Sequence, residues 1–106
     1  LMNLPIAQAY LKQYKNAIES YQKFIELHPE DPEGYYGISR IYIETEAYEK
    51  ALDNAMKSFI MYKEIKSPYH KDAQNVIIIL YKKMKENDMI ETYEKNAEKK
   101  NINVQG

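Results

Sequence analysis

An internal repeat with a period of 34 residues constrains this chain more than any other feature of its sequence. When the 106 residues are aligned with themselves at this offset, large apolar side chains coincide with large ones and small with small. The coinciding pairs are Leu1 and Tyr35, Leu4 and Ile38, Tyr14 and Tyr48, Ala17 and Ala51, Ile18 and Leu52, and Ile25 and Phe59. A period of this length is typical of arrays in which each repeat is a pair of helices that buries its apolar side against the next. We therefore predict a stack of helical hairpins.

The residues that start and end helices also predict an all-helical chain. It has three Gly and four Pro, and no stretch of alternating β-branched residues. Asp31-Pro32 and Ser67-Pro68 each combine a capping side chain with a Pro at the first helical position, so both predict helix starts. Asn87 can end a helix in the left-handed conformation while Asp88 caps the next one. We expect six helices, over residues 4–12, 14–28, 32–45, 47–66, 68–86 and 88–100.

Large and small residues follow a recognisable pattern within the repeats. The second copy reads Tyr35-x2-Ile38-Ser39-x2-Tyr42, then Tyr48-x2-Ala51-x3-Ala55-x2-Ser58, and the first copy supplies Tyr14-x2-Ala17-x3-Tyr21-x2-Phe24 and a closing Pro29. This pattern resembles the tetratricopeptide repeat (TPR) family. The resemblance implies an all-α fold of antiparallel helical hairpins stacked as a short right-handed α-solenoid. The residues that would pack the repeats together are Tyr14, Ala17, Tyr21, Phe24, Tyr35, Ile38, Ser39, Tyr42, Tyr48, Ala51 and Ala55.

The three units are unequal copies. Pro5 falls inside the first helix of copy one, so we expect that helix to start late, with Asn3 as its cap. In the third hairpin, Lys83 and Thr92 stand where the repeat expects Tyr and Ala. The expected organisation is one TPR-like domain over residues 1–100 and a polar tail over 101–106, with a truncated repeat one at 1–31, repeat two at 32–66 and a degenerate third hairpin at 67–100.

The resemblance also implies a function, because TPR proteins hold a partner peptide or helix in a concave groove lined by the first helix of each repeat. By alignment, the groove residues of this chain would be Tyr10, Glu33, Tyr36, Arg40, Ile43, Glu44 and Tyr81. Arg40 is the only Arg of the sequence. It could bind a partner carboxylate while Tyr36 and Tyr10 contact apolar side chains, or it could pair with Glu44 one turn along the helix.

The five consecutive apolar residues Val76, Ile77, Ile78, Ile79 and Leu80 cover every side of a helix. One helix face cannot bury all of them. One interpretation is that the preceding long helix and the final helix enclose the run. The alternative is a contact with a second copy of the chain, that is, a homodimer formed through these residues.

Composition and motifs argue against catalysis. There is no Cys, the two His are His28 and His70, and no Gly-rich phosphate loop or metal-ligand spacing occurs. The net charge of −1 gives no field for nucleic acid, and acids interrupt the Lys clusters at 82–85 and 99–100. No apolar run is long enough to span a membrane. We therefore predict a soluble protein that is not an enzyme, with no cofactor, no metal, no nucleic-acid partner and no membrane span. The compartment is open, with the cytoplasm slightly favoured over export.

The function that these observations favour is a non-enzymatic scaffold for protein–protein interaction. An alternative is a regulatory or substrate-recruiting domain of a larger enzyme or complex. Another is a self-associating structural unit. The sequence does not identify the partner, because the recognisable residues of such a repeat build the stack and leave the groove free to vary.

Overall fold

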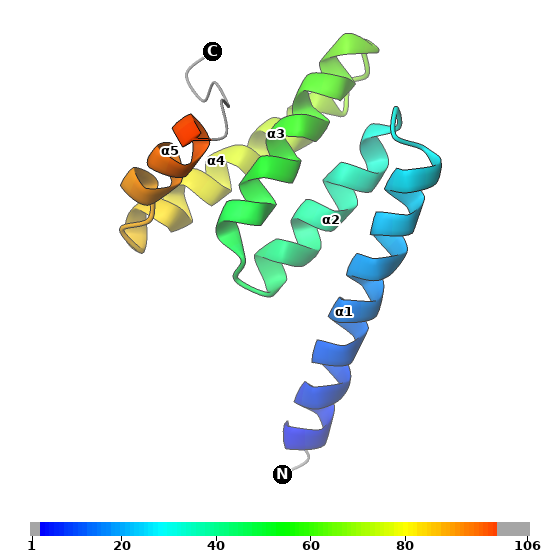
Figure 1. Cartoon of the computed structure of the whole chain (residues 1–106), viewed down its shortest axis with the longest axis vertical. Coiled ribbons are helices and arrows are strands. Elements are labelled where there is room, and N and C mark those ends of the chain that lie inside the picture. The colour runs from blue at the N-terminus through cyan, green and yellow to red at the C-terminus, as the bar shows by residue number, and fades with distance from the viewer. Residues whose placement is uncertain (1–2, 100–106) are drawn as a thin grey trace.

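The computed structural model describes residues 3–99, with side chains from Gln13 onward, and this part contains five α-helices and no strand. The all-α prediction is therefore confirmed. The helices lie side by side in chain order, and α1 and α5 are at opposite ends (Figure 1). Their bounds are α1 Asn3–Leu27, α2 Pro32–Glu44, α3 Tyr48–Glu64, α4 His70–Glu86 and α5 Ile90–Lys99.

The prediction of two helices over residues 4–12 and 14–28 is wrong, because α1 is one continuous helix of 25 residues. In repeat two, Tyr42 and Tyr48 are six residues apart and flank a turn in which Glu46 has a φ of 61°. The corresponding Tyr10 and Tyr14 are only four residues apart, which is about one helical turn. The three residues between them all favour helix, so nothing ends the helix there.

Most other helix boundaries follow the predicted signals within two residues. Asp31 is the N-cap of α2, and its side chain accepts a hydrogen bond of 2.9 Å from the backbone N–H of Glu33. Ser67 accepts a hydrogen bond of 3.2 Å from the backbone N–H of Tyr69, but α4 begins only at His70. At the end of α4, Asp88 and not Asn87 adopts the left-handed conformation, with a φ of 54°.

The core lies between α3, α4 and α5. It is built from Ala51, Leu52 and Ala55 on α3, which have no exposed surface, and from residues on α4 and α5. The small residues let the helices approach closely, and the larger ones fill the space between them. The members on α4 and α5 are Val76, Leu80, Met84, Tyr93 and Ala97.

The apolar run on α4 is only partly enclosed. Val76 and Leu80 are buried and Ile77 is half-buried, whereas Ile78 and Ile79 keep 59% and 49% of their surface exposed. The neighbouring helices therefore cover three of the five residues. Val76 and Leu80 cannot take part in a contact with a second copy, because they already pack in the core.

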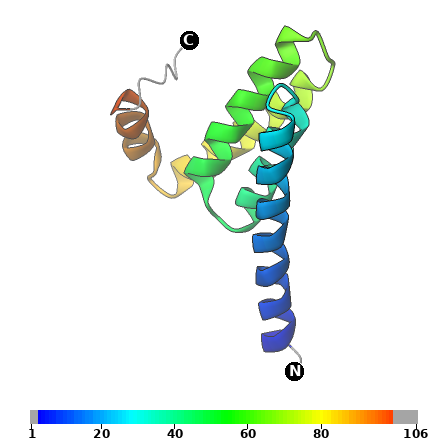
Figure 2. The same cartoon turned by 45° about the vertical axis from the view of Figure 1, so that its right-hand side comes forward.

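Neighbouring helices make most of the packing. α3 packs against both α2 and α4, and α2 also contacts α4 directly, so these three helices form the centre of the molecule. α1 packs against α2, and its N-terminal half runs past the end of α2 (Figures 1 and 2). α2 thus lies between α1 and α4, which is the arrangement that creates the candidate site.

Candidate functional site: two hollows beside α2

The predicted repeat-packing residues are all buried or half-buried. Ile38, Ser39, Ala51 and Ala55 are buried. The hydroxyl of Ser39 donates a 2.7 Å hydrogen bond to the carbonyl oxygen of Tyr36, so this buried polar group is paired. The half-buried members are Tyr14, Ala17, Tyr21 and Phe24 on α1 and Tyr35, Tyr42 and Tyr48 on α2 and α3.

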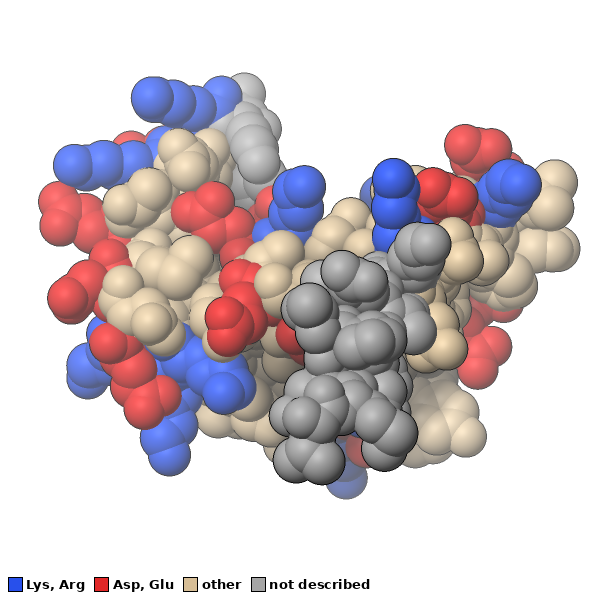
Figure 3. Space-filling model, turned by 90° about the horizontal axis from the view of Figure 1, so that it is seen from below, with Lys and Arg blue, Asp and Glu red and all other residues tan. Residues whose placement is uncertain are grey.

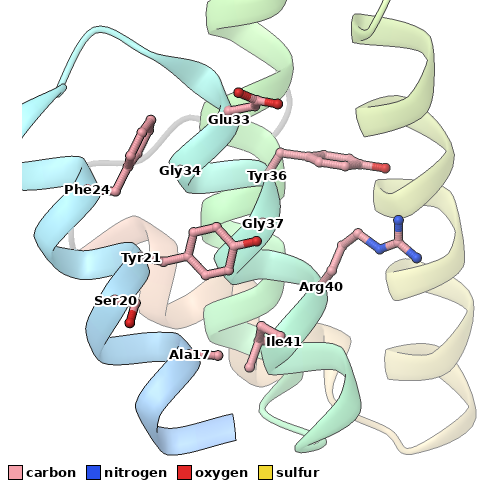
Figure 4. Close-up of a pocket in the computed structure, with 10 residues that line it drawn as sticks. All are labelled: Ala17, Ser20, Tyr21, Phe24, Glu33, Gly34, Tyr36, Gly37, Arg40 and Ile41. Carbon is pink, nitrogen blue, oxygen red and sulfur yellow. The ribbon is translucent and has the colours of Figure 1, made fainter. Parts of the chain in front are cut away.

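The larger hollow lies between α1 and α2 and has a volume of about 770 Å³. Ala17, Tyr21 and Phe24 line it from α1, and Gly34 and Gly37 from α2 (Figure 4). The ring of Tyr21 points at the backbone of α2 beside Gly37. A Cβ atom built on Gly37 would overlap this ring and lie 2.7 Å from its hydroxyl oxygen. Glycine at this position is therefore what lets the Tyr21 ring lie against α2.

The smaller hollow lies between α2 and α4 and has a volume of about 320 Å³. It contains four of the predicted groove residues, namely Tyr36, Arg40, Ile43 and Glu44. Asp72, Asn75, Val76 and Ile79 line it from α4. Tyr36 and Arg40 line both hollows, and Figure 4 shows their side chains pointing away from α1. The two hollows therefore form one continuous surface with Tyr36 and Arg40 on the ridge between them.

Arg40 is the main charged group of this ridge. Its guanidinium carbon lies 5.9 Å from the centre of the Tyr36 ring, a cation–π contact. The predicted pair with Glu44 does not form, because the only ion pair among the described residues joins Lys95 and Glu91. Arg40 is exposed and is therefore available to an external carboxylate.

A row of tyrosines continues the surface behind Tyr36. The Tyr36 ring meets Tyr62 edge-on at 6.1 Å between ring centres, and Tyr62 contacts Tyr69 at 5.8 Å. Burial raises the pKa of Tyr62 to about 12, and the carboxylates of Glu33 and Asp31 act in the same direction. These rings hold Tyr36 from behind, which limits its freedom before any partner binds.

Two predicted groove residues, Glu33 and Tyr81, lie elsewhere. Glu33 lines only the hollow between α1 and α2. Tyr81 faces α5, where burial and then the carboxylate of Glu94 raise the pKa of its hydroxyl. The side chain of Tyr10 lies outside the described part of the structure.

The groove residues of α4 were missed because the third unit does not keep the period of the first two. An offset of 39 residues, instead of 34, aligns Glu33 with Asp72, Tyr36 with Asn75, and Arg40 with Ile79. These are the α4 residues that line the smaller hollow. The longer α3, which ends at Glu64 and is followed by Ser67-Pro68, was the available signal.

A third hollow lies beside the α3–α4 turn and has a volume of about 430 Å³, larger than the hollow between α2 and α4. Its lining is basic, with Lys63, Lys66 and Lys71 beside His70. Basic and acidic side chains are interspersed over the face shown in Figure 3, including the α5 end at its left. Within residues 3–99 no group of three or more potential ligands could hold a metal ion. None of the helices in that range is long and apolar enough to cross a membrane.

Comparison with protein families, curated proteins and solved structures finds no match to this chain. Its function is therefore inferred from the surface around α2.

Proposed function

We propose that this chain is a non-enzymatic protein-binding module of the tetratricopeptide type. Two features support the proposal. The small residues of the repeat pattern, Ser39, Ala51, Ala55 and Ser58, have no exposed surface. The helices at either side of the α2–α3 turn pack closely on each other, as a hairpin unit requires.

The observation that carries the proposal is the position of Arg40. It lies on an exposed ridge, stacked on Tyr36, without an acidic partner among the described residues. Ile43 and Ile79 lie beside it in the smaller hollow. Aromatic and Arg side chains next to apolar ones are the combination most often found at the centres of protein interfaces.

The charges of the hollow indicate what the partner presents. Arg40 would pair with a carboxylate, and the carboxylates of Glu44 and Asp72 would pair with a basic side chain. Ile43 and Ile79 would contact an apolar side chain of the same segment. The proposed ligand is thus a short peptide segment with an acidic, an apolar and a basic group, whose order fixes its direction along α2.

Selection from a displayed peptide library on the intact chain tests this proposal. We expect enriched peptides to carry an acidic group, and we expect Arg40→Glu to weaken their binding about tenfold or more. Lys82→Glu is the matched control, because it makes the same charge reversal at an exposed residue outside both hollows. Circular dichroism verifies that both variants are folded. Equal binding of the enriched peptides to the two variants would refute the proposal.

A further inference from the structure

The hollow between α1 and α2 has a counterpart beside α3 and α4, and there the corresponding place is occupied by α2. At the offset of 39 residues, Glu33, Tyr36 and Gly37 of α2 correspond to Asp72, Asn75 and Val76 of α4. These α4 residues face α2, which packs against both α3 and α4. α1 packs against α2, and α3 packs against α4. When the first pair is aligned with the second, the hollow of about 770 Å³ between α1 and α2 is where a helix equivalent to α2 would lie.

The helix equivalent to α2 is present in the sequence, at residues 3–12. Repeat one is two residues shorter than repeat two at the position of the α2–α3 turn. When the alignment includes this gap, Ile6, Ala7 and Tyr10 align with Ile38, Ser39 and Tyr42. In the structure this segment is the N-terminal half of α1. It extends away from the rest of the molecule (Figures 1 and 2) and cannot reach the hollow of its own chain while α1 is continuous.

The composition of this segment is unlike that of a solvated helix. Lys12 is the one charged residue among residues 3–12, although the chain has 15 basic and 16 acidic residues in total. A helix with this composition normally packs against another surface. The overhang of α1 beyond the 13 residues of α2 is 12 residues, or about 18 Å, which is close to the length of about 20 Å of α2 itself.

We propose that the hollow between α1 and α2 is filled by residues 3–12 of a second copy of this chain, in a reciprocal exchange. Each copy supplies the helix that the other lacks, so the contact is self-complementary about a two-fold axis. The helices α2 and α3 are antiparallel about the turn at Glu46. In the exchange, residues 3–12 of one copy pair in the same way with the residues after Gln13 of the other copy. The two α1 helices then run antiparallel, with Gln13 of one copy opposite Gln13 of the other.

The proposed exchange leaves the smaller hollow between α2 and α4 open. Ile43, Glu44 and Ile79 line only that hollow. Exchange and peptide binding therefore use different surfaces, which meet at Tyr36 and Arg40. The proposal does not depend on the function proposed above.

The absence of cysteine permits a direct test by single-cysteine cross-linking. Gln13→Cys places a thiol at the proposed axis, on the same side of α1 as Ala17 and Tyr21. Lys15→Cys is the matched control, because Lys15 is equally exposed but lies on the opposite side of the helix. We expect the wild-type chain to sediment as a dimer at high micromolar concentration. We also expect mild oxidation to cross-link Gln13→Cys at least about tenfold faster than Lys15→Cys.

Any other pair of results overturns the proposal. A monomer at high micromolar concentration would mean that no second copy fills the hollow. A dimer in which the two cysteine variants cross-link at equal rates would mean that the copies meet elsewhere. A further variant, Tyr10→Glu, adds a charge to the exchanged segment and should give a monomer with unchanged circular dichroism of the remaining helices. A persistent dimer in this variant would also overturn the proposal.

Discussion

Tyr93 is the largest buried side chain of α5, and its removal gives a sharp prediction. Tyr93 is 3% exposed, and its hydroxyl donates a 2.8 Å hydrogen bond to Oδ1 of Asp53 on α3. The same hydroxyl lies 3.6 Å from Sδ of Met56. Burial raises the pKa of Tyr93, and the hydrogen bond to Asp53 raises it further, so the group stays neutral at ordinary pH. Tyr93 thereby joins α5 to a helix 40 residues earlier in the chain.

Replacing Tyr93 by Phe removes the hydroxyl and keeps the ring. Hydrogen bonds to charged groups contribute about 1.5–3 kcal/mol. Asp53 is only half-buried and regains water when the hydroxyl is lost, so the lower end of that range applies. We expect Tyr93→Phe to lower the free energy of unfolding by about 1.5 kcal/mol. Tyr93→Ala also removes the buried ring and should cost about 3–5 kcal/mol.

Urea denaturation combined with a double-mutant cycle measures this contribution. Tyr93→Phe, Asp53→Asn and the double variant should show a coupling of about 1 kcal/mol, which separates this bond from other interactions of Asp53. Hydrogen exchange should show that the amides of α5 lose protection while those of α2 do not. A coupling below about 0.3 kcal/mol would refute the conclusion that this hydrogen bond holds α5 in place.

Three further predictions concern the core and the α1–α2 contact. Leu80→Ala should lower the free energy of unfolding by about 3 kcal/mol in urea denaturation, because Leu80 has no exposed surface; a loss under about 1 kcal/mol would mean that the core closes around the gap. Gly37→Ala should destabilise the chain by about 1 kcal/mol, because the new methyl group displaces the Tyr21 ring. In a chain that already carries Tyr21→Ala, the same substitution should stabilise the fold by about 1 kcal/mol, because Ala favours helix more than Gly does. The same sign in both backgrounds would exclude the clash with Tyr21. The raised pKa of Tyr62 means that its stabilising effect is complete below pH 10 and is lost as the pH rises to about 12, by about 1.4 kcal/mol per pH unit. Tyr62→Phe should show a shallower loss of stability over that interval, measured by denaturation at several pH values, and an unchanged slope would contradict the assignment.

The sequence predicted best those features that depend on local chemistry. Asp31 and Pro32 begin α2 as expected, because a capping carboxylate and a proline act within a few residues. The buried Ser39, Ala51 and Ala55 were also predicted, since small residues at regular spacing are needed wherever two helices approach closely.

The remaining features depend on insertions and deletions of a few residues. A turn shortened by two residues turns the predicted first hairpin into the single helix α1. A longer second unit changes the alignment of α4, so Tyr81 faces α5 while Ile79 lines the hollow beside α2. A periodic alignment without gaps cannot detect either change, although each one moves a whole helix face.

The position of α3 has a consequence for the hollow between α2 and α4. α3 packs against both α2 and α4, whereas Arg40 and Ile79 on those two helices face each other across the hollow. The angle between α2 and α4 is therefore set from behind, by buried residues such as Ala55 that no ligand touches. Enlarging such a residue would increase the angle between α2 and α4 and widen the hollow between them. Under the proposed function, substitutions in the core would thus change partner choice while every residue of the proposed binding surface stays the same.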